Sequence, residues 1–470
     1  MTRLPFLLVA VCLAGVLAAG GPTGAASPPN IVVFLTDDQD QLDSSVYGDR
    51  RIRTPQMERL ARAGMAFTQA FAASPTCAPS RASLLTGMMP ARNGAEDNHA
   101  IARAAIRKLP AYFEALGYEV VAFGKVAHYE HAGKHYGFQR AEFDRFMDHR
   151  GMEAAAAFLA ARDAKRAKPL LLLVGTQWPH RPWPEAPGDH DPAAVDIPPN
   201  LVDTPVTRAF RARYYHAVTK ADDYLGAIYD AARTHLGERT LFLMSSDHGA
   251  QWPLGKWNLY DAGIRVPLIV AWPGMVKPGT RTDAMVSWVD LLPTLVEAAG
   301  GTPPPTGTGA GQIDGRSFLD VLRGTRAVHR ERIFATHTGD RAMNVYPIRA
   351  VRTPTWKYIR NLHPEFQHTT HIDRAKEDDE VAYFRSWERA AAAGDAHAAT
   401  AVRRYRERPG DELYDLTSDP SEQRNLAAEP VHARRLAEMR GELEAWMRDQ
   451  GDTQPVVHPP VLLPPPAERK

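Results

Sequence analysis

The stretch "NIVVFLTDD" (residues 30–38) joins an uninterrupted apolar run to two carboxylates that follow it directly. Four further apolar runs of similar length occur at 119–124, 170–175, 240–246 and 266–272. Such runs are typical of parallel strands that are buried on both faces. Helical spacing of apolar residues alternates with them, at 55–64, 221–237 and 290–300. This alternation predicts an α/β domain around a mostly parallel sheet flanked by helices.

The pattern changes after a Gly- and Pro-rich stretch at 300–312, which is predicted to be a surface loop. The stretch 346–362 predicts two short antiparallel strands, and 432–450 predicts an amphipathic helix. Between them, 369–408 is charged and rich in alanine, which predicts exposed helices. The predicted division is a larger N-terminal domain over 27–344, a smaller C-terminal α+β domain over 345–454 and a Pro-rich tail over 455–470 that is extended or disordered.

The first residues have the composition of an export signal. Arg3 precedes an apolar run over 4–19, and the small residues at 24–26 fit a cleavage site. We predict a signal peptide over 1–26 and a periplasmic or secreted mature protein. A lipoprotein signal that ends at Cys12 is the alternative. The apolar run is shorter than the ~18 residues that a membrane span needs, and no span is expected elsewhere.

The charge balance limits the classes of partner. Lys and Arg total 56, Asp and Glu total 55, and the formal net charge is +1. A general nucleic-acid or membrane-surface binder would carry a net basic charge, so neither partner is expected. An anionic ligand would have to be held by a local cluster of cations.

The residues that follow the predicted strands are chemically alike, and ligands of open α/β sheets bind outside the carboxyl ends of the strands. These positions, with one lysine beyond them, hold Asp37, Asp38, Lys125, His128, His180, Arg181, Asp247, His248 and Lys256. Each residue alone is more simply a solvated or packing residue, but their common place at one edge favours a site. Three aspartates and a neutral histidine favour Ca²⁺ or Mg²⁺ over zinc. The cations around such a metal would form a pocket for a tetrahedral oxyanion ester.

A single cysteine stands apart from this set. The segment "SPTCAPSRASLLTG" (74–87) contains Cys77, and the other cysteine, Cys12, lies in the predicted signal peptide. An exported chain with one cysteine cannot form an intramolecular disulfide. Cys77 is therefore either buried and inert or chemically converted. The residues after it predict the first turn of a helix, whose N–H groups and Arg81 would add to the anion pocket.

The same segment resembles the signature of type I sulfatases, Cys-x-Pro-Ser-Arg followed by a short spacer and Thr-Gly. The resemblance extends from "PNIVVFLTDD" through "SDHG" to "ELYDLTSDPSEQRNLA" near the C-terminus. It implies an alkaline-phosphatase-like fold, a catalytic N-terminal domain and a sulfated saccharide as substrate. It also implies that a formylglycine-generating or other sulfatase-activating enzyme oxidises Cys77 to formylglycine.

The resemblance implies a role for each matching residue. One Ca²⁺, or less favourably Mg²⁺, would be held by Asp37, Asp38, Asp247, His248 and the converted Cys77. Many family members have asparagine at the position of His248. The other implied residues are Arg81 and His128 beside the formylglycine hydrate, Lys125 and Lys256 on the sulfate, and His180 as proton donor to the leaving group. One hydroxyl of the hydrate would attack sulfur and the other would then expel sulfate, whereas a serine would stay sulfated.

Two kinds of sulfatase compete as models for the substrate. The segments "GKVAH" and "SDHG" resemble iduronate-2-sulfatase, whereas "WNLY" (257–260), "PHR" (179–181) and "YPIRAVRT" (346–353) resemble heparan N-sulfatase. We favour the second, although Trp178 stands where that pattern has an acidic residue. Candidate substrate contacts are Asn98, His99, His337 and Arg341. Trp252 and Trp257 are candidates to flank a sugar, with packing as the alternative.

The sequence leaves two other functions open. One is a phosphate or phosphonate ester hydrolase of the same superfamily, which would differ in the ester that it cleaves. The other is a non-enzymatic, glycan-binding pseudo-sulfatase. A pseudo-sulfatase tolerates the loss of key residues, but every key position is present in this chain.

Overall fold

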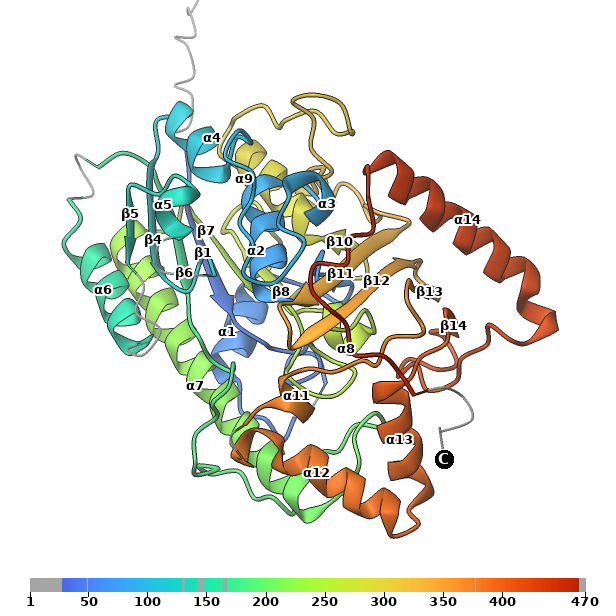
Figure 1. Ribbon diagram of the computed structural model, residues 1–470. Helices are drawn as coiled ribbons and strands as arrows, with labels where there is room; N and C mark the ends of the chain where they lie inside the picture. The colour runs from blue at the N-terminus through green and yellow to red at the C-terminus, as the bar shows by residue number, and fades with distance from the viewer. Residues whose placement is uncertain are drawn as a thin grey trace, which may run out of the picture.

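Figure 1 shows the computed structural model, which describes residues 28–464 apart from 49, 129–131, 143–147, 164–166 and 377. The predicted signal peptide over 1–26 lies outside the described residues. The largest element is an eight-stranded sheet in the order β5-β4-β6-β1-β7-β8-β2-β9. Its strands are β1 (Asn30–Thr36), β2 (Met65–Phe67), β4 (Glu119–Gly124), β5 (Arg140–Glu142), β6 (Leu170–Gly175), β7 (Thr240–Ser246), β8 (Leu268–Ala271) and β9 (Thr280–Thr282).

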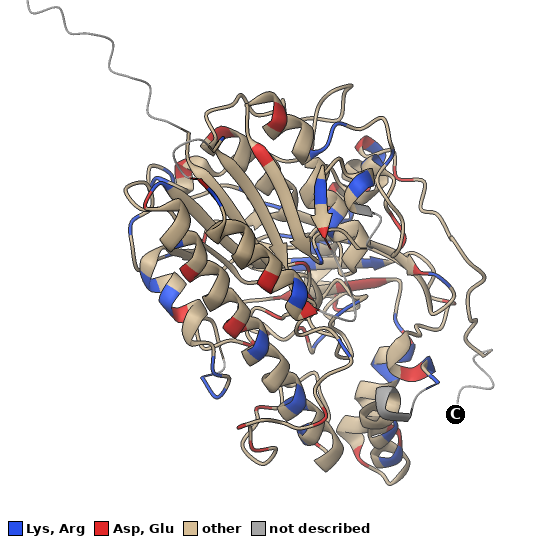
Figure 2. Ribbon diagram, turned by 90° about the vertical axis from the view of Figure 1, so that its left-hand side faces the viewer, with Lys and Arg blue, Asp and Glu red and all other residues tan. Residues whose placement is uncertain are grey.

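The centre of this sheet is parallel, as the sequence predicts. β5, β4, β6, β1 and β7 run in one direction, with Thr36 of β1 opposite Ser246 of β7 and Leu35 opposite Gly175 of β6. Residues 31–35 are fully buried, which explains why the run "IVVFL" shows no polar alternation. Figure 2 shows the charged residues mainly on the helices and loops around the sheet.

The run at 266–272 is not a parallel strand, which corrects our expectation. Its central part, β8, pairs antiparallel with β7, with Val270 opposite Leu243. A parallel neighbour would need a crossover to the other end of the sheet, usually through a helix. The segment 247–267 contains only the short helix α8 (Asp261–Ile264) and turns directly back into β8. A run that is buried on both faces does not reveal the direction of its strand.

Helices cover both faces of the sheet (Figure 1). One face carries α1 (Pro55–Ala63), α6 (Asp148–Ala160) and α7 (Pro205–Leu236), and the other carries α2 (Cys77–Thr86), α4 (Leu109–Ala115) and α9 (Leu291–Ala298). Each face has its own apolar core. Val32 of β1 belongs to the core beneath α1, α6 and α7, and its neighbour Val33 belongs to the core beneath α2, α4 and α9. Smaller elements are α3 (Pro90–Asn93), α5 (Ala132–His135), α10 (Leu319–Leu322), the 3-10 turn η1 (Trp288–Asp290), and a two-stranded sheet of β3 (Ala70–Phe71) and β10 (Val286–Ser287). Among the described residues, no helix combines the length and hydropathy that crossing a bilayer requires.

The helices predicted from apolar spacing are present, and the first of them is capped by a distant residue. Those at 55–64, 221–237 and 290–300 correspond to α1, the second half of α7, and η1 with α9. Thr54 occupies the N-cap position of α1, but its side chain makes no capping hydrogen bond. The N–H groups of Gln56 and Met57 donate instead to the carboxylate of Asp222, each at 2.8 Å. The cap comes from α7, so the local pattern could not show it.

A second, antiparallel sheet lies in the C-terminal part of the chain (Figure 1). Its order is β11 (Ile333–Asp340), β12 (Asn344–Arg352), β13 (Trp356–Asn361) and β14 (Asp411–Asp415). β12 and β13 are the two strands predicted within 346–362, and α14 (Ala433–Asp449) is the predicted amphipathic helix. α14 packs Met439, Leu443 and Met447 against this sheet. The domain boundary at 344/345 stays a prediction, and the sheet already begins at Ile333, upstream of it.

The helices between β13 and β14 are less exposed than predicted. The region 369–408 forms α11 (His371–Arg374), α12 (Asp378–Ala392) and α13 (Ala396–Arg406). Tyr383, Phe384, Trp387 and Tyr405 are at most 1% exposed and belong to an apolar core shared with α7. The helices are therefore amphipathic, and the many alanines and charges in the segment concealed their aromatic face. The tail continues to 464 as mostly irregular chain, and it bonds back to 365–367 through the backbone.

Asp290 is a buried carboxylate that holds the start of α9 in place. It accepts hydrogen bonds from the N–H groups of Ser287 and Arg316, both at 2.9 Å, and from Nε of Arg330 at 2.6 Å. Burial raises the pKa of this carboxyl, but the Arg330 guanidinium more than offsets burial and holds the pKa well below its usual range. A depressed pKa in the folded state means that Asp290 stabilises the fold above about pH 4, and that this contribution is lost as the pH falls.

We expect Asp290→Asn to lower the free energy of unfolding at neutral pH by about 3–5 kcal/mol, the usual effect of removing one partner of a buried ion pair. Urea unfolding of both proteins, repeated from neutral pH down to about pH 3, measures the effect. The difference between the two proteins is expected to shrink as the pH falls, because the wild-type carboxylate loses its advantage. A difference that stays constant across this range would contradict the assignment.

Candidate active site

The parallel strands end at one edge of the central sheet, and the predicted site residues lie in the loops that follow them. The chain leaves β1 into Asp37 and Asp38, β4 into Lys125, β6 into the loop that carries His180, and β7 into Asp247 and His248. Backbone hydrogen bonds tie these loops together beyond the strands. The N–H of Asp247 donates to the Thr36 carbonyl at 3.2 Å, and that of Lys125 to the Gly175 carbonyl at 2.7 Å. Segments far apart in the sequence therefore meet at one place.

Cys77 is the first residue of α2 and lies among these loops. Its Sγ is 3.6 Å from Asp37 Oδ1, 3.7 Å from Lys125 Nζ and 3.3 Å from His248 Nε2. The thiol is buried, and burial together with the charge of Asp37 raises its pKa well above the usual value. An unconverted thiol beside these carboxylates stays protonated, and a protonated thiol is a weak nucleophile. The position therefore suits a converted side chain better than a reactive thiolate.

Metal-ligating atoms surround Cys77. Within the described part of the chain, two overlapping groups have ligand atoms that all lie within 4.8 Å of one another: Asp37, Asp38, Cys77 and His180, and Asp37, Cys77, Asp247 and His248. The Nδ1–H of His248 donates to the Gly249 carbonyl at 3.0 Å, which leaves Nε2 as the nitrogen with a lone pair, 3.4 Å from Asp38 Oδ1. Three carboxylates and one such imidazole nitrogen fit a hard divalent cation.

Arg81 and Lys125 hold Asp37 between them. Arg81, on the first turn of α2, reaches Asp37 Oδ1 with Nη2 at 3.1 Å and Asp247 Oδ2 with Nε at 3.0 Å. Lys125 Nζ contacts the other oxygen of Asp37. Burial raises the pKa of Asp37, but Lys125 and Arg81 outweigh burial and hold this pKa well below its usual value. Asp37 is therefore ionised and available to a cation at neutral pH.

Lys256 and His180 face Asp38 in the same way. Lys256 Nζ lies 2.8 Å from both oxygens of Asp38, and it lowers the pKa of Asp38 although burial raises it. The Nδ1–H of His180 donates to the Arg181 carbonyl at 2.5 Å, which turns Nε2 toward Asp38, 3.9 Å from Oδ2. Burial, reinforced by the two lysines, lowers the pKa of His180 to about 4. An anion bound beside His180 would raise this pKa.

Asn98 and His99 join this edge from the loop that precedes α4. Asn98 Oδ1 accepts the N–H of Ala78 at 3.2 Å, and His99 Nδ1 lies 2.7 Å from Nε2 of the predicted His128. Asn98 Nδ2 and His99 Nε2 both contact Asp340, each at 3.0 Å. Both residues are therefore hydrogen-bonded parts of the site, and their contact with a substrate stays a prediction.

His337 and Arg341 lie elsewhere than expected. His337 is buried within the four-stranded sheet, where its Nε2 is 2.6 Å from Asn344 Oδ1 and burial lowers its pKa to about 4. Its side chain is 1% exposed, so it does not reach a surface at which a substrate could bind. Arg341 forms the exposed turn after β11, with φ of 49°. Position before a predicted strand could not distinguish a strand interior from a turn.

Trp252 and Trp257 are packed residues. Trp252 packs against Trp183 with ring centroids 4.8 Å apart and the rings tilted by 32°, in the aromatic core that α7 and α12 share. Trp257 is 1% exposed, and its Nε1 donates to Asp340 Oδ2 at 2.8 Å. The packing alternative therefore holds for both indoles.

Asp340 is the residue that sequence reasoning missed. It ends β11 and accepts hydrogen bonds from Asn98, His99 and Trp257, which lie beside Cys77, His128 and Lys256. Its partner Asn98 is 242 positions away in the sequence, so no local motif marks it. Ser80 was also missed, although it belongs to the quoted segment, and its Oγ donates to the Asp247 carbonyl at 2.6 Å.

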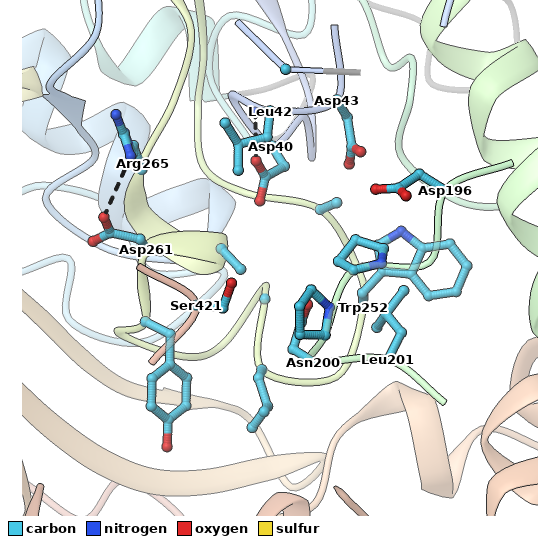
Figure 3. Close-up of a pocket in the computed structure, with 18 of the residues that line it drawn as sticks. Asp40, Leu42, Asp43, Asp196, Asn200, Leu201, Trp252, Asp261, Arg265 and Ser421 are labelled. Atoms are coloured by element: carbon cyan, nitrogen blue, oxygen red, sulfur yellow. Dashed lines mark hydrogen bonds and ion pairs between the residues drawn. The ribbon is translucent and has the colours of Figure 1, made fainter. Parts of the chain in front are cut away.

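A cavity of about 670 Å³ near this edge is a separate feature (Figure 3). Its lining includes Asp40 and Asp43 from the loop after β1, Leu254 from the loop after β7, and Ser421 from the C-terminal part. None of the residues predicted to bind metal or to act in catalysis lines it. The side chains around Cys77 instead close on one another through ion pairs.

Comparisons with known proteins match most of the chain. The Sulfatase family matches residues 29–301, and the family described as N-sulphoglucosamine sulphohydrolase, C-terminal, matches residues 250–392. A relative named ulvan-active sulfatase, from Formosa agariphila, is 31% identical over 459 residues, which cover 93% of this chain and 84% of that protein. N-sulphoglucosamine sulphohydrolase from Homo sapiens is 28% identical and 91% of each chain is covered.

Solved structures share the fold at lower identity. A protein in complex with its substrate D-glucosamine-2-N,6-O-disulfate matches with a TM-score of 0.67 and 19% identity, over 92% of this chain and 100% of that one. The phosphonate monoester hydrolase of Agrobacterium radiobacter matches with a TM-score of 0.68 and 19% identity, over 93% and 100%. The fold is therefore common to enzymes for different esters, and the sequence matches decide the family. They cover more than half of the chain, they include a relative that is 31% identical, and they show that this chain belongs to the sulfatase family, whose members hydrolyse sulfate esters or sulfamates.

Proposed function

We propose that this sulfatase removes the N-sulfate of glucosamine residues in heparan-type glycosaminoglycans. The observation that carries the proposal is the match of residues 250–392 to the N-sulphoglucosamine sulphohydrolase C-terminal family. That region contains Lys256, which holds Asp38, and Asp340, which holds His99. The part of the chain that resembles the N-sulfatase therefore contributes directly to the neighbourhood of Cys77.

The sulfatase family uses a formylglycine and a divalent metal, and we propose Cys77 as the converted residue and Ca²⁺ as the metal. Asp37, Asp38 and Asp247 supply three carboxylates, which suits Ca²⁺, whereas Mg²⁺ is usually bound by one or two carboxylates and water. When bound, the cation polarises the sulfate oxygens and the converted residue supplies the attacking hydroxyl. Arg81 contacts two of these carboxylates, Asp37 and Asp247.

Lys125, Lys256 and Arg81 are the fixed positive charges that a sulfate would meet. All three are at most 5% exposed, so their charges act through a medium that screens them far less than water. Positive groups that are already in place stabilise charge that develops on the sulfate oxygens during bond cleavage. We propose that this is their role in the reaction.

His180 is the proposed proton donor to the leaving nitrogen. Its Nδ1 is tied to the Arg181 carbonyl, so Nε2 is the atom that faces the reacting edge. A sulfate between the two lysines offsets the charges that, with burial, lower the pKa of His180 to about 4. A proton held on Nε2 can then pass to the nitrogen that leaves with the sugar.

We further propose that the chain is exported by its predicted signal peptide over 1–26 and that a sulfatase-activating enzyme converts Cys77. The single cysteine of the mature chain supports conversion, because an unconverted thiol would be at risk of oxidation in an oxidising compartment. Intact-mass analysis tests both points, since the mature N-terminus and the aldehyde each change the mass.

A second candidate substrate is a sulfate ester of ulvan. It is favoured by the 31% identity to the ulvan-active sulfatase, which exceeds the identity to the human N-sulfatase. Trp178 also stands where the heparan N-sulfatase pattern has an acidic residue. A uronate 2-O-sulfate is the third, on the resemblance of "GKVAH" and "SDHG".

The experiment uses protein whose Cys77 conversion is confirmed by mass. It is incubated with heparan saccharides that differ by one sulfate each and with ulvan oligosaccharides, and the remaining sulfates are located. Loss of only the glucosamine N-sulfate, with release of a free amine, is the expected result. Loss of a uronate 2-O-sulfate or of ulvan sulfate alone would overturn the proposed substrate and leave the sulfatase family assignment intact.

Asp247→Asn is expected to remove the bound cation. The substitution keeps the shape of the side chain but removes the negative charge that a hard cation requires, and it also weakens the contact with Arg81. Metal analysis after dialysis should find about one Ca²⁺ per chain in the wild type and close to none in the variant. Asp97→Asn, at a carboxylate outside both ligand groups, should keep the wild-type content. A metal content in Asp247→Asn equal to that of the wild type would show that the metal is bound by other residues.

A further inference from the structure

We infer that Asp340 is a positioning residue of this active site, which fixes the tautomer of His128 through His99 and the start of the Cys77 helix through Asn98. The inference rests on the proposed function only in that His128 and Cys77 are taken to act on the sulfate. Asp340 is the last residue of β11, so the inference means that the C-terminal sheet helps to position the active-site residues.

Asp340 is 2% exposed, and its carboxylate accepts three hydrogen bonds from the described residues. Its Oδ1 accepts from His99 Nε2 at 3.0 Å, and its Oδ2 accepts from Asn98 Nδ2 at 3.0 Å and from Trp257 Nε1 at 2.8 Å. The neighbouring Gly339 carbonyl accepts the N–H of Asn98 at 2.9 Å, which fixes the loop to the strand. A single carboxylate of the C-terminal sheet thus holds side chains from two separate loops.

The first connection from Asp340 runs through the imidazoles of His99 and His128. An ionised carboxylate only accepts hydrogen bonds, so His99 carries a proton on Nε2, and in the neutral ring its Nδ1 then has the lone pair. That lone pair accepts from Nε2 of His128 at 2.7 Å, which places the His128 proton on Nε2 and leaves Nδ1 as the basic nitrogen. Burial raises the pKa of Asp340, but its donors, His99 first, outweigh burial and keep it ionised. Asp340 therefore sets the direction of both hydrogen bonds, from His99 to Asp340 and from His128 to His99.

The second connection from Asp340 runs through Asn98 to the start of α2, the helix that begins with Cys77. Asn98 donates to Asp340 with Nδ2, which fixes its amide so that Oδ1 faces the N–H of Ala78 at 3.2 Å. Trp257, the third donor, also gives its backbone N–H to the Pro75 carbonyl at 3.0 Å and directly follows Lys256. The segments on both sides of Cys77 are therefore tied to the same carboxylate.

Asp340→Asn separates a positioning role from a merely structural one. Two donors face Oδ2 and one faces Oδ1, so the amide oxygen satisfies more donors on the Oδ2 side and the NH₂ then faces His99. His99 would have to accept at Nε2 and donate from Nδ1, which moves the proton of His128 to Nδ1. A comparable Asp→Asn change behind a catalytic histidine leaves geometry intact and lowers kcat by about 10⁴-fold in serine proteases.

The experiment compares wild type, Asp340→Asn and Asp97→Asn, a matched control at the half-buried carboxylate beside Asn98. Histidine ¹⁵N NMR on the full-length mature protein reads the tautomer of His128, and steady-state kinetics on the substrate cleaved by wild type reads kcat and KM. We expect Nε2–H in wild type and in the control, Nδ1–H in Asp340→Asn, and a fall in kcat of about 10²–10⁴-fold with KM little changed. His128 protonated on Nδ1 in wild type, or an unchanged tautomer in Asp340→Asn, would overturn the inference.

A double variant tests whether Asp340 acts through His99. If it does, His99→Gln and Asp340→Asn together should lower kcat no further than the larger single effect. Multiplied losses would show that the two residues act independently and would overturn the relay. The NMR result requires neither a known substrate nor converted Cys77. A wild type that cleaves none of the tested saccharides would therefore defeat the proposed function alone, and the tautomers would still decide this inference.

Discussion

Cys77→Ala is expected to lower turnover by about 10⁴–10⁶-fold, the usual effect of removing the nucleophile of a covalent mechanism. The fold should be unaffected, because the substitution removes one sulfur atom from a buried side chain. Cys77→Ser is expected to behave differently. A serine hydroxyl at the start of α2 can accept the sulfuryl group, but it has no second hydroxyl with which to expel sulfate.

Intact-mass analysis after incubation with substrate separates the two variants. The serine protein should gain the mass of one SO₃ group per chain and then stop, whereas the alanine protein should gain nothing. Ser83→Ala is a matched control on the same helix, since within the described part of the chain Ser83 Oγ bonds only to the Pro79 carbonyl one turn away, at 2.9 Å. It should keep wild-type turnover. Near-normal turnover by Cys77→Ala would remove Cys77 from the mechanism.

His180→Gln is expected to have an effect that depends on the leaving group. A sugar amine or alcohol leaves poorly without a proton, so loss of the donor should slow its release by about 10²–10⁴-fold. An aryl sulfate releases a stabilised phenolate that needs little protonation, and its rate should fall much less. Gln keeps a polar side chain opposite Asp38, where Nε2 of His180 lies 3.9 Å from Oδ2.

The ratio of the two rates is therefore the informative quantity for His180→Gln. Both substrates are assayed with the same enzyme preparation, so any loss of folded protein or of converted Cys77 cancels. Lys256→Gln provides a contrast, because a group that holds the sulfate should affect both substrates about equally. An equal fall for both substrates in His180→Gln would show that His180 binds or positions the substrate and does not donate the proton.

The sheet was predictable where burial on both faces dominates the sequence pattern. The runs at 30–35, 119–124, 170–175 and 240–246 have no polar alternation because their side chains face two separate cores. The direction of β8 was not predictable, because an apolar run has the same pattern in a parallel and an antiparallel strand. The aromatic face of α12 was missed because its packing against α7 is a contact between distant segments.

The site was predictable where a residue directly follows a strand. Asp37, Asp38, Lys125, Asp247 and His248 meet because parallel strands place their carboxyl ends at one edge. Asp340 was not predictable, because it comes from the other sheet and its importance lies in partners from distant loops. His337, three residues earlier on β11, was predicted as a substrate contact, but its side chain is 1% exposed and bonds to Asn344 at the start of β12.

The most direct test of the proposed function is the hydrolysis of matched substrates by one preparation of protein with confirmed Cys77 conversion. N-sulfoglucosamine, an aryl sulfate, an aryl phosphate and a phosphonate monoester are assayed side by side, each also with Cys77→Ala. We expect release of sulfate and free amine in equal amounts from N-sulfoglucosamine, faster than any phosphate or phosphonate cleavage and absent from Cys77→Ala. Faster cleavage of the phosphate or phosphonate, or sulfate release that persists in Cys77→Ala, would contradict the proposed function.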